Sequence, residues 1–423
     1  MNNKNILLIC YTFPPNEGIG GRRWVKFSKE LYKRGYTVFV ICAERFTEKE
    51  SLWSKSLMSG INLITLPSKY PAYLYYPPKN IFQKIKYRYY LMKHKIVTQG
   101  NYYDRAVSWE KQIIRKAALI IKENSIKNVI VSGAPFHLFK HTIKLKEIFP
   151  AVKFVADYRD PWTNNRNSFG LNSISEKRIK CEIESEREIL KKYDAILVVA
   201  EQMKEYLISL DANVENKIYT LENGFDYDDF SAIKLNHKTQ QVKIRFLFAG
   251  NLYRKVEYLF IPFLKAICKI RTDNPDYFNL LDINFFGGFP EEYKILVSEY
   301  KLNDAVKTHG EVPLARIYQE ISYADVCMLF LNKEFSFSLS TKFCEYISQK
   351  KNILVFSNGG HTADFIVKNK IGYAAQPDTI FEQLQKIISD FENKNLCFNP
   401  HFDISKYSLQ SLTNRLEVIL SNL

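Results

Sequence analysis

The sequence lacks long apolar runs, paired cysteines and low-complexity tracts. No stretch is long and apolar enough to span a bilayer, and the apolar run that starts at Ile6 becomes polar by Tyr11, too soon for a signal peptide. The seven cysteines are widely spaced without a CxxC pair, which is typical of reduced thiols in a protein core and not of a disulfide framework. We therefore expect a cytoplasmic protein.

Acidic residues are scarce. The 60 lysines and arginines outnumber the 45 aspartates and glutamates, and the net charge of +15 indicates an acidic partner such as a nucleotide, a nucleic acid or an anionic membrane. The segment 51–103 has no acidic residue, and its basic residues alternate with tyrosines. This pattern favours peripheral contact with the anionic inner face of the cell membrane. A basic helix packed on its own domain is the alternative.

Two series of apolar runs, separated by segments of helical period, predict the fold. The first series lies at 5–10, 37–41, 128–131, 153–156 and 195–199. The second lies at 244–248, 282–286, 326–330 and 352–356. Because these runs are apolar on both faces, they belong in parallel sheets that helices cover on both sides. We predict an α/β protein with two Rossmann-like, doubly wound domains that face an interdomain cleft.

Breaks in this pattern set the predicted domain boundaries. A polar stretch at 235–241 predicts a linker. We place the domains at 1–226 and 227–405, followed by a C-terminal helix at 406–423 that packs back on the first domain. Ligands of doubly wound sheets bind beyond the carboxyl ends of the strands, so functional residues are expected in the loops there.

The loop 14–21, between the first strand and a helix predicted from Trp24 onward, is rich in glycine. It ends in Gly20 and Gly21, and Arg22 and Arg23 follow. Backbone amides at a helix start suit a phosphate, so this loop predicts an anion site. The glycine spacing does not match a dinucleotide fingerprint, and a simple turn is the alternative.

Charged residues follow two other strands of the first domain. Asp157, Arg159 and Asp160 come directly after the run 153–156, at a strand's carboxyl end, where α/β sites are built. A structural Asp–Arg pair is the alternative interpretation. His137 lies just past another strand and is either a site residue or an ordinary structural histidine.

In the second domain, Gly250 begins the loop after the first strand. Arg254 and Lys255 follow it, and two cations there could neutralise a diphosphate leaving group, with solvated surface charge as the alternative.

A capped helix start is predicted at Ser340, Thr341 and Lys342, where the backbone amides form a second anion cradle. Glu345 falls on the first turns of this helix and could accept hydrogen bonds from ribose hydroxyls. An ordinary solvent-facing glutamate is the alternative.

Together these segments resemble the retaining glycosyltransferases of the GT-B fold, family four type, especially bacterial members that act in surface-polysaccharide assembly, such as that of O-antigen, capsule or exopolysaccharide. The resemblance covers nearly the whole chain and rests on the segments 11–15, 20–22, 135–137, 157–162, 223–226, Gly250 and 340–346. The segment 157–162 is the most specific of them.

The resemblance implies a transferase that moves a sugar from a nucleotide-sugar donor to a lipid-linked or saccharide acceptor. The second domain would bind the donor, with Glu345 on the ribose and with Arg254 or Lys255 and the amides near Ser340 on the diphosphate. The first domain would bind the acceptor, and Gly20 and Gly21 would approach the phosphates. Such enzymes are thought to react by front-face displacement, which needs no metal and no other cofactor.

One position departs from the family. The family usually has two glutamates about two helical turns apart, of which the second matches Glu345, but Phe337 holds the first position. Glu334 is a nearby substitute. Two other functions remain open: a non-catalytic nucleotide-sugar-binding subunit, and a nucleotide-sugar epimerase, although the carboxylates that an epimerase usually places around C2 of the sugar are not evident. The motifs do not fit a nucleic-acid binder, so we expect no nucleic acid as a partner.

Overall fold

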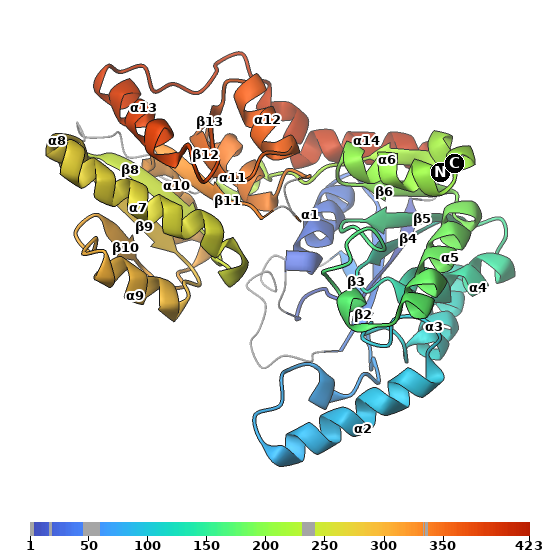
Figure 1. Ribbon diagram of the computed structural model, residues 1–423. Coiled ribbons are helices and arrows are strands. Elements are labelled where there is room, and N and C mark those ends of the chain that lie inside the picture. Colours follow the sequence, from blue (N-terminus) through green and yellow to red (C-terminus); the bar gives the residue numbers. More distant parts are fainter. Residues whose placement is uncertain (1–3, 17–18, 45–59, 231–241, 333, 335–336) are drawn as a thin grey trace. The chain divides into compact units, whose positions relative to one another are not determined.

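The computed structural model describes residues 4–16, 19–44, 60–230, 242–332, 334 and 337–423 (Figure 1). Its contacts divide the chain into two compact units, one made of Met1–Glu222 with Leu412–Leu423 and the other of Asn223–Ser411. The predicted linker at 235–241, residues 17–18 of the predicted anion loop and residues 51–59 of the basic segment lie outside the described residues.

The N-terminal unit is built on a seven-stranded sheet. Its strands are β1 (Asn5–Cys10), β2 (Thr37–Ala43), β3 (Ile61–Leu66), β4 (Asn128–Gly133), β5 (Lys153–Tyr158), β6 (Ala195–Val198) and β7 (Ile218–Thr220). All pairs are parallel, in the order β3-β2-β1-β4-β5-β6-β7. In the central register Leu8 of β1 pairs with Val40 and Ile130, all buried, as the two-sided apolar pattern predicts.

The helices of this unit are α1 (Ile19–Lys33), α2 (Ile81–Val97), α3 (Glu110–Glu123), α4 (His137–Ile148), α5 (Glu176–Lys192), α6 (Glu201–Leu210) and, from the end of the chain, α14 (Leu409–Ser421) from Leu412 onward. Arg34, just after α1, anchors α14, because its guanidinium donates to Asn414 Oδ1 and Glu417 Oε2 at 2.5 Å each. The unit therefore includes residues from both ends of the sequence.

Helix α1 begins earlier than the sequence predicted. It starts at Ile19, so Gly20, Gly21 and Arg22 belong to its first turn and not to the preceding loop. The reason lies in a close approach: a Cβ on Gly21 would lie 2.9 Å from the Thr12 carbonyl oxygen. The glycine therefore lets the helix pack against the loop backbone, although glycine in a sequence usually indicates a turn.

The C-terminal unit contains a six-stranded parallel sheet in the order β10-β9-β8-β11-β12-β13. The strands are β8 (Ile244–Ala249), β9 (Leu281–Phe286), β10 (Val306–Thr308), β11 (Val326–Phe330), β12 (Asn352–Phe356) and β13 (Gly372–Ala375). The helices are α7 (Glu257–Asp273), α8 (Pro275–Asn279), α9 (Glu291–Glu299), α10 (Leu314–Tyr323), α11 (Thr341–Ser348), α12 (His361–Lys368) and α13 (Ile380–Glu392). Alternate residues of β8 join two separate apolar clusters, one on each face: Phe246 and Phe248 pack with α7, whereas Leu247 packs with α10 and α11.

Both sheets reverse their winding beside the first strand of the unit. In the first sheet β1 lies between β2 and β4, and in the second β8 lies between β9 and β11. The loops that leave two such neighbouring strands diverge and open a crevice at the carboxyl edge of the sheet. This topology predicts sites among the residues that follow β1, β4, β8 and β11.

The described part of the basic segment 51–103 forms β3, the short helix η2 (Ala72–Leu74) and α2. In Figure 1, α2 extends along the edge of its unit, away from the central strands. Within the described residues, no helix has both the length and the apolar character that crossing a membrane requires.

Candidate functional site

Glycines shape the carboxyl end of β8. Gly250 follows the strand directly and has a φ of +117°, a conformation that favours glycine. A Cβ on Gly287, which follows β9, would lie 2.5 Å from the Gly250 carbonyl oxygen. Asn251 joins the same two loops, because its Oδ1 accepts a hydrogen bond of 3.0 Å from the Gly288 amide. The backbones of the two strand ends therefore approach closely at Gly250 and Gly287, and the Asn251 side chain links the loops that follow.

Lys342, on α11, brings a positive charge to this edge. Its Nζ lies 4.3 Å from the centre of the Phe248 ring and donates to the Asn251 carbonyl oxygen at 3.5 Å. A Cβ added to Gly250 would come within 2.8 Å of the same Nζ. Burial lowers the pKa of Lys342 to about 8, and the nearby Glu345 carboxylate opposes this shift. Lys342 is therefore the predicted donor-site cation that lies against the end of β8.

The start of α11 carries the other predicted donor residues of this segment. Ser340 caps the helix, because its Oγ accepts a hydrogen bond of 3.2 Å from the Phe343 amide. Thr341 and Lys342 are the first two helical residues, whose amides have no partner within a helix. The cap and these amides form a polar helix start beside the Lys342 ammonium.

Glu345 lies one turn further along α11 and is buried, with 7% of its surface exposed. Its Oε1 accepts a hydrogen bond of 3.4 Å from the Tyr318 hydroxyl, which also lies 3.1 Å from Asp229 Oδ2. Glu345 is therefore not the solvent-facing helix glutamate that the sequence left as the alternative interpretation. Tyr318 and Asp229 were not identified from the sequence, since neither belongs to a recognisable motif.

Arg254 and Lys255 lie in the short helix η6 (Arg254–Val256), and their side chains are 74% and 59% exposed. Arg254 pairs with Glu292 at 2.5 Å, and Lys255 pairs with Glu334 at 3.3 Å. Exposed ion pairs of this kind contribute about 0–1 kcal/mol, so either side chain can exchange its carboxylate for another anion at little cost. Glu334 is the acid that the sequence suggested as a substitute for the glutamate missing at position 337. It thus forms an ion pair with Lys255.

One acidic pair of this unit has the spacing of a metal-binding motif, with Asp226 and Asp228 on either side of Tyr227. The Asp226 carboxylate is buried and caps the helix η5 (Tyr227–Asp229), because it accepts a hydrogen bond of 3.0 Å from the Asp228 amide. Among the residues that the structure describes, no group of three or more His, Cys, Asp or Glu side chains is arranged to hold a metal ion.

In the N-terminal unit, Asp157 is a buried anchor on β5. Its Oδ2 accepts hydrogen bonds from Trp24 Nε1 at 2.6 Å and Ser132 Oγ at 2.8 Å, and its Oδ1 lies 3.4 Å from Arg23 Nε. The Arg23 guanidinium also donates to two backbone carbonyls just after β7, at 2.7 Å each. Asp157 thus fixes α1 against β4 and β5. Arg23, which follows the predicted anion loop in the sequence, thus faces the interior of the unit.

Arg159 joins the loops that follow β4 and β5. It donates from Nε to the Gly133 carbonyl at 2.7 Å and from Nη2 to the Ala134 carbonyl at 2.8 Å. Its Nε also lies 3.5 Å from Asp160 Oδ2, and 36% of the Asp160 side chain is exposed. Asp160 is therefore the acid of this segment that reaches solvent, whereas Asp157 is enclosed.

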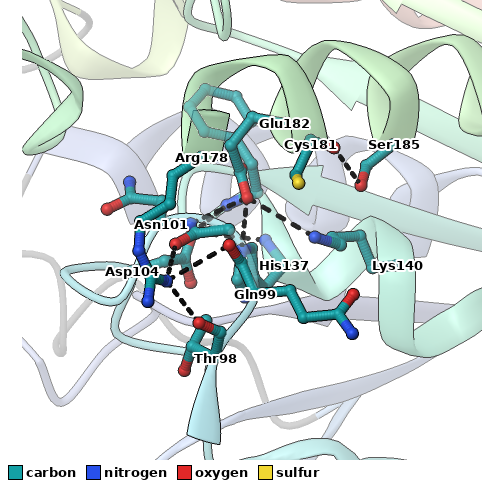
Figure 2. A network of polar contacts seen from close by, with 12 residues as sticks. Thr98, Gln99, Asn101, Asp104, His137, Lys140, Arg178, Cys181, Glu182 and Ser185 are labelled. Atoms are coloured by element: carbon teal, nitrogen blue, oxygen red, sulfur yellow. Dashed lines mark hydrogen bonds and ion pairs between the residues drawn. The ribbon is translucent and has the colours of Figure 1, made fainter. Parts of the chain in front are cut away.

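His137 belongs to a buried polar network centred on Glu182 of α5 (Figure 2). Its Nε2 lies 3.1 Å from Glu182 Oε1, which also accepts hydrogen bonds from the Asn101 amide at 2.8 Å and Lys140 Nζ at 3.4 Å. Trp162 Nε1 donates to the other oxygen at 3.1 Å. Burial alone would raise the pKa of Glu182, but His137, Lys140 and the Asn101 amide lower it to about 2. These contacts favour the structural interpretation of His137, and a part in catalysis stays a prediction.

Asp104 closes the amide end of α4. Its Oδ2 accepts hydrogen bonds from the Phe136 and His137 amides at 2.7 and 3.2 Å, and its Oδ1 accepts from the Ala106 amide at 2.9 Å. Sequence reasoning missed both Asp104 and Glu182. Glu182 stands in a helix of mostly charged residues, and nothing in the sequence separates it from its solvated neighbours.

No protein-family profile and no curated protein matches this sequence. Solved structures match it along nearly the whole chain. A glycosyltransferase from Rickettsia africae ESF-5 is 16% identical, with a TM-score of 0.62 over 100% of this chain and 99% of its own. Anabaena Alr3699/HepE in complex with UDP-glucose is 11% identical, with a TM-score of 0.63 over 99% of this chain and 100% of its own. The UDP-GlcNAc 2-epimerase from Methanocaldococcus jannaschii is 13% identical, with a TM-score of 0.55 over 99% of this chain and 100% of its own.

At these identities the matches concern architecture. They extend over both units of the chain, and each unit is a doubly wound parallel sheet covered by helices. The fold predicted from the sequence is therefore confirmed: the chain has the GT-B fold, with two Rossmann-like domains in tandem.

Proposed function

We propose that this protein is a retaining glycosyltransferase, which moves a sugar from a nucleotide-sugar donor to a lipid-linked or saccharide acceptor in surface-polysaccharide synthesis. One observation carries the proposal. At the carboxyl edge of the second sheet, the Lys342 ammonium lies against Gly250, which has no side chain, and the buried Glu345 carboxylate lies one turn further along the same helix. Groups that bind an anion and a hydroxyl, side by side at a switch point, suit a nucleoside diphosphate. The similarity in fold to a protein crystallised with UDP-glucose supports a donor of this class.

In the proposed donor complex each group has one task. Lys342 and the first amides of α11 bind the diphosphate, and Arg254 or Lys255 leaves its surface ion pair to bind a further phosphate oxygen. Glu345 accepts hydrogen bonds from the ribose hydroxyls. Because Gly250 has no side chain, the Lys342 ammonium fits against the end of β8, beside the proposed position of the phosphates.

The proposed chemistry is a front-face displacement. The bond between the anomeric carbon and the phosphate oxygen breaks, and the acceptor oxygen bonds to the same face of that carbon. The acceptor's proton passes to a phosphate oxygen of the departing nucleotide. Lys342 stabilises the negative charge that develops on the diphosphate. In this scheme neither a metal ion nor another cofactor takes part.

The N-terminal unit binds the acceptor in this proposal. The first turn of α1, at Gly20, Gly21 and Arg22, stays a predicted contact of the donor phosphates. In this proposal Asp160, which is partly exposed after β5, contacts acceptor hydroxyls. Arg159 holds the loops that carry this surface. A lipid-linked acceptor would place the enzyme at the cytoplasmic face of the cell membrane.

A turnover assay tests the proposal. The purified chain is incubated with a nucleotide-sugar, with and without lipid-linked saccharides and with and without EDTA, and nucleoside diphosphate release is measured. We expect release that depends on the acceptor, persists in EDTA and falls at least tenfold in Lys342→Met, together with a product that keeps the donor's anomeric configuration. Lys265→Met, which changes an exposed lysine of the same unit, is the matched control.

Because a UDP-GlcNAc 2-epimerase has a similar fold, epimerase activity is the alternative function. If the chain interconverts the sugar's C2 epimers without any acceptor, it is an epimerase. Tight donor binding with no turnover on any acceptor would instead identify a non-catalytic binding subunit.

A further inference from the structure

Helix α2 exposes more apolar surface than folding explains. Only its inner side contacts the rest of the unit, and His94 is its one buried residue. Six large apolar side chains, each between 57% and 76% exposed, are Ile81, Phe82, Ile85, Tyr89, Met92 and Ile96, and Val97, the last residue of the helix, is 68% exposed as well. A contiguous exposed apolar surface of this kind marks an interaction site in most soluble proteins.

The six side chains from Ile81 to Ile96 form one stripe along the helix, which we call the α2 stripe. Ile81, Ile85, Tyr89, Met92 and Ile96 follow one another at intervals of three or four residues, so they share a face of the helix, and Phe82 extends that face sideways. The face that the stripe leaves free is the one that packs on the unit, where Tyr90 stacks on Tyr73 with ring centres 5.8 Å apart.

Cations flank the α2 stripe on both sides. With 3.6 residues per turn, Lys84, Arg88 and Lys95 fall along one edge of the stripe and Lys86 and Lys93 along the other. The helix contains no acidic residue. Long basic side chains beside an apolar face are typical of a helix that lies in a lipid interface, where they reach the headgroups.

The helix keeps its place without using the stripe. At its start the Asn80 side chain accepts a hydrogen bond of 2.9 Å from the Gln83 amide. At its end Arg178 of α5 donates to the Lys95 carbonyl at 2.6 Å and to the Gly100 carbonyl at 2.9 Å. Since both ends and the inner face are fixed by other residues, polar substitutions in the stripe leave the fold intact.

We propose that α2 lies flat in the surface of an anionic lipid bilayer, with the α2 stripe among the upper acyl chains and the flanking cations on headgroup phosphates. Charge complementarity selects this partner, because a wholly basic border around an apolar stripe matches an anionic interface and not a nucleic acid. The inference deepens the proposed function, since a lipid-linked acceptor is presented at such a surface, and it names the element that makes the contact.

Vesicle flotation with the full chain tests the inference. Vesicles of phosphatidylcholine alone are compared with vesicles that also contain phosphatidylglycerol. The double substitution Ile85→Gln with Ile96→Gln is expected to weaken vesicle binding about tenfold or more, because two aliphatic side chains that the bilayer would bury are lost. Leu119→Gln with Ile148→Gln removes two other exposed apolar side chains of the same unit and is expected to bind like the wild type.

Neutralising the flanking cations is expected to affect vesicle binding differently. Lys84→Gln and Arg88→Gln are each expected to lower binding to anionic vesicles about fivefold, with little effect on phosphatidylcholine vesicles. Circular dichroism and the urea midpoint verify that every variant is folded.

The outcomes separate this inference from the donor site. Glu345→Gln is expected to float like the wild type even if it binds no nucleotide, and the stripe variant is expected to keep full nucleotide affinity. Folded wild type that does not float, or a stripe variant that floats equally well, overturns the inference. A dimer in lipid-free solution that the stripe substitutions dissociate also overturns it, in favour of a second copy of the chain as the partner.

Discussion

The Lys342 ammonium lies in the space that a side chain on Gly250 would need. A Cβ on Gly250 would lie 2.4 Å from Lys342 Cε and 2.8 Å from Nζ. The φ of +117° at Gly250 independently favours glycine. The two residues come from the end of β8 and the start of α11, and their contact puts a positive charge at the switch point of the second sheet.

The first prediction concerns this contact. Gly250→Ala displaces Lys342, and we expect nucleotide affinity, measured by calorimetry, to fall about tenfold, because a hydrogen bond to a charged group contributes about 1.5–3 kcal/mol. Gly35→Ala is the control for backbone strain, since Gly35 has a φ of +81° but no atom within 4 Å of the added Cβ. It should lose stability without losing affinity. Unchanged affinity in Gly250→Ala would remove Lys342 from the donor site.

The pH dependence of donor binding follows from the same lysine. Burial lowers the pKa of Lys342 from 10.5 to about 8, so the free protein loses this charge as pH rises above about 8. A diphosphate binds the protonated form, and its affinity should therefore fall above that pH by up to about tenfold per pH unit. Lys342→Arg keeps its charge and should give a flatter profile, while titration of the ligand itself affects both proteins equally. Parallel profiles would contradict a diphosphate contact.

Asp157 is expected to matter for stability. Asp157→Ala leaves the buried Arg23 without its carboxylate and removes the acceptor of Trp24 and Ser132. Breaking a buried pair in this way costs about 3–5 kcal/mol, measurable as a lower free energy of unfolding in urea. Asp160→Ala, which removes a partly exposed acid, should cost less than about 1 kcal/mol. Equal losses in the two variants would show that the buried network is not the source of the effect.

Two glutamates one turn apart on α5 should give opposite pH effects. Burial raises the pKa of Glu186 from 4.5 to about 8, although Thr163 opposes the shift, whereas Glu182 has a pKa of about 2. Between about 4.5 and 8 the folded chain keeps a proton on Glu186 that the unfolded chain has released, so this group makes stability fall with rising pH. The fall is at most about 1.4 kcal/mol per pH unit. Glu182 acts in the other direction, and its contribution is lost as pH falls from about 4.5 to about 2.

Glu186→Gln tests this assignment, because glutamine resembles the protonated acid. We expect its free energy of unfolding to decline less steeply than that of the wild type as pH rises from about 5 to about 8. Curves of equal slope would show that Glu186 is ionised in the folded protein.

The sequence predicted the inner strands of both sheets and missed all four edge strands. β3, β7, β10 and β13 lie at the edges, are partly exposed and are mostly short. In β10, for example, only Val306 is buried. An edge strand covered on fewer sides needs no continuous apolar run, so the pattern that reveals a central strand is absent.

Gly250 follows β8 directly, as the sequence predicted, whereas Asp157, which was expected just after a strand, lies within β5. The partners of site residues were not predictable, because the contact of Lys342 with Gly250 and the burial of Glu182 depend on packing between distant segments. The glycines at the start of α1 misled the sequence interpretation, since Gly21 serves a close helix–loop contact.

In the proposed function the C-terminal unit binds a nucleotide-sugar through Lys342 and Glu345. The most direct test is a calorimetric panel of UDP-, GDP-, ADP- and CMP-sugars on the wild type, Lys342→Met and Glu345→Gln, with the exposed Glu299→Gln as control. We expect the wild type to bind one nucleotide family. The affinity should be about tenfold or more lower in both site variants and unchanged in the control. Folded wild-type protein that binds none of these donors, or site variants that bind like the wild type, would contradict the proposed function.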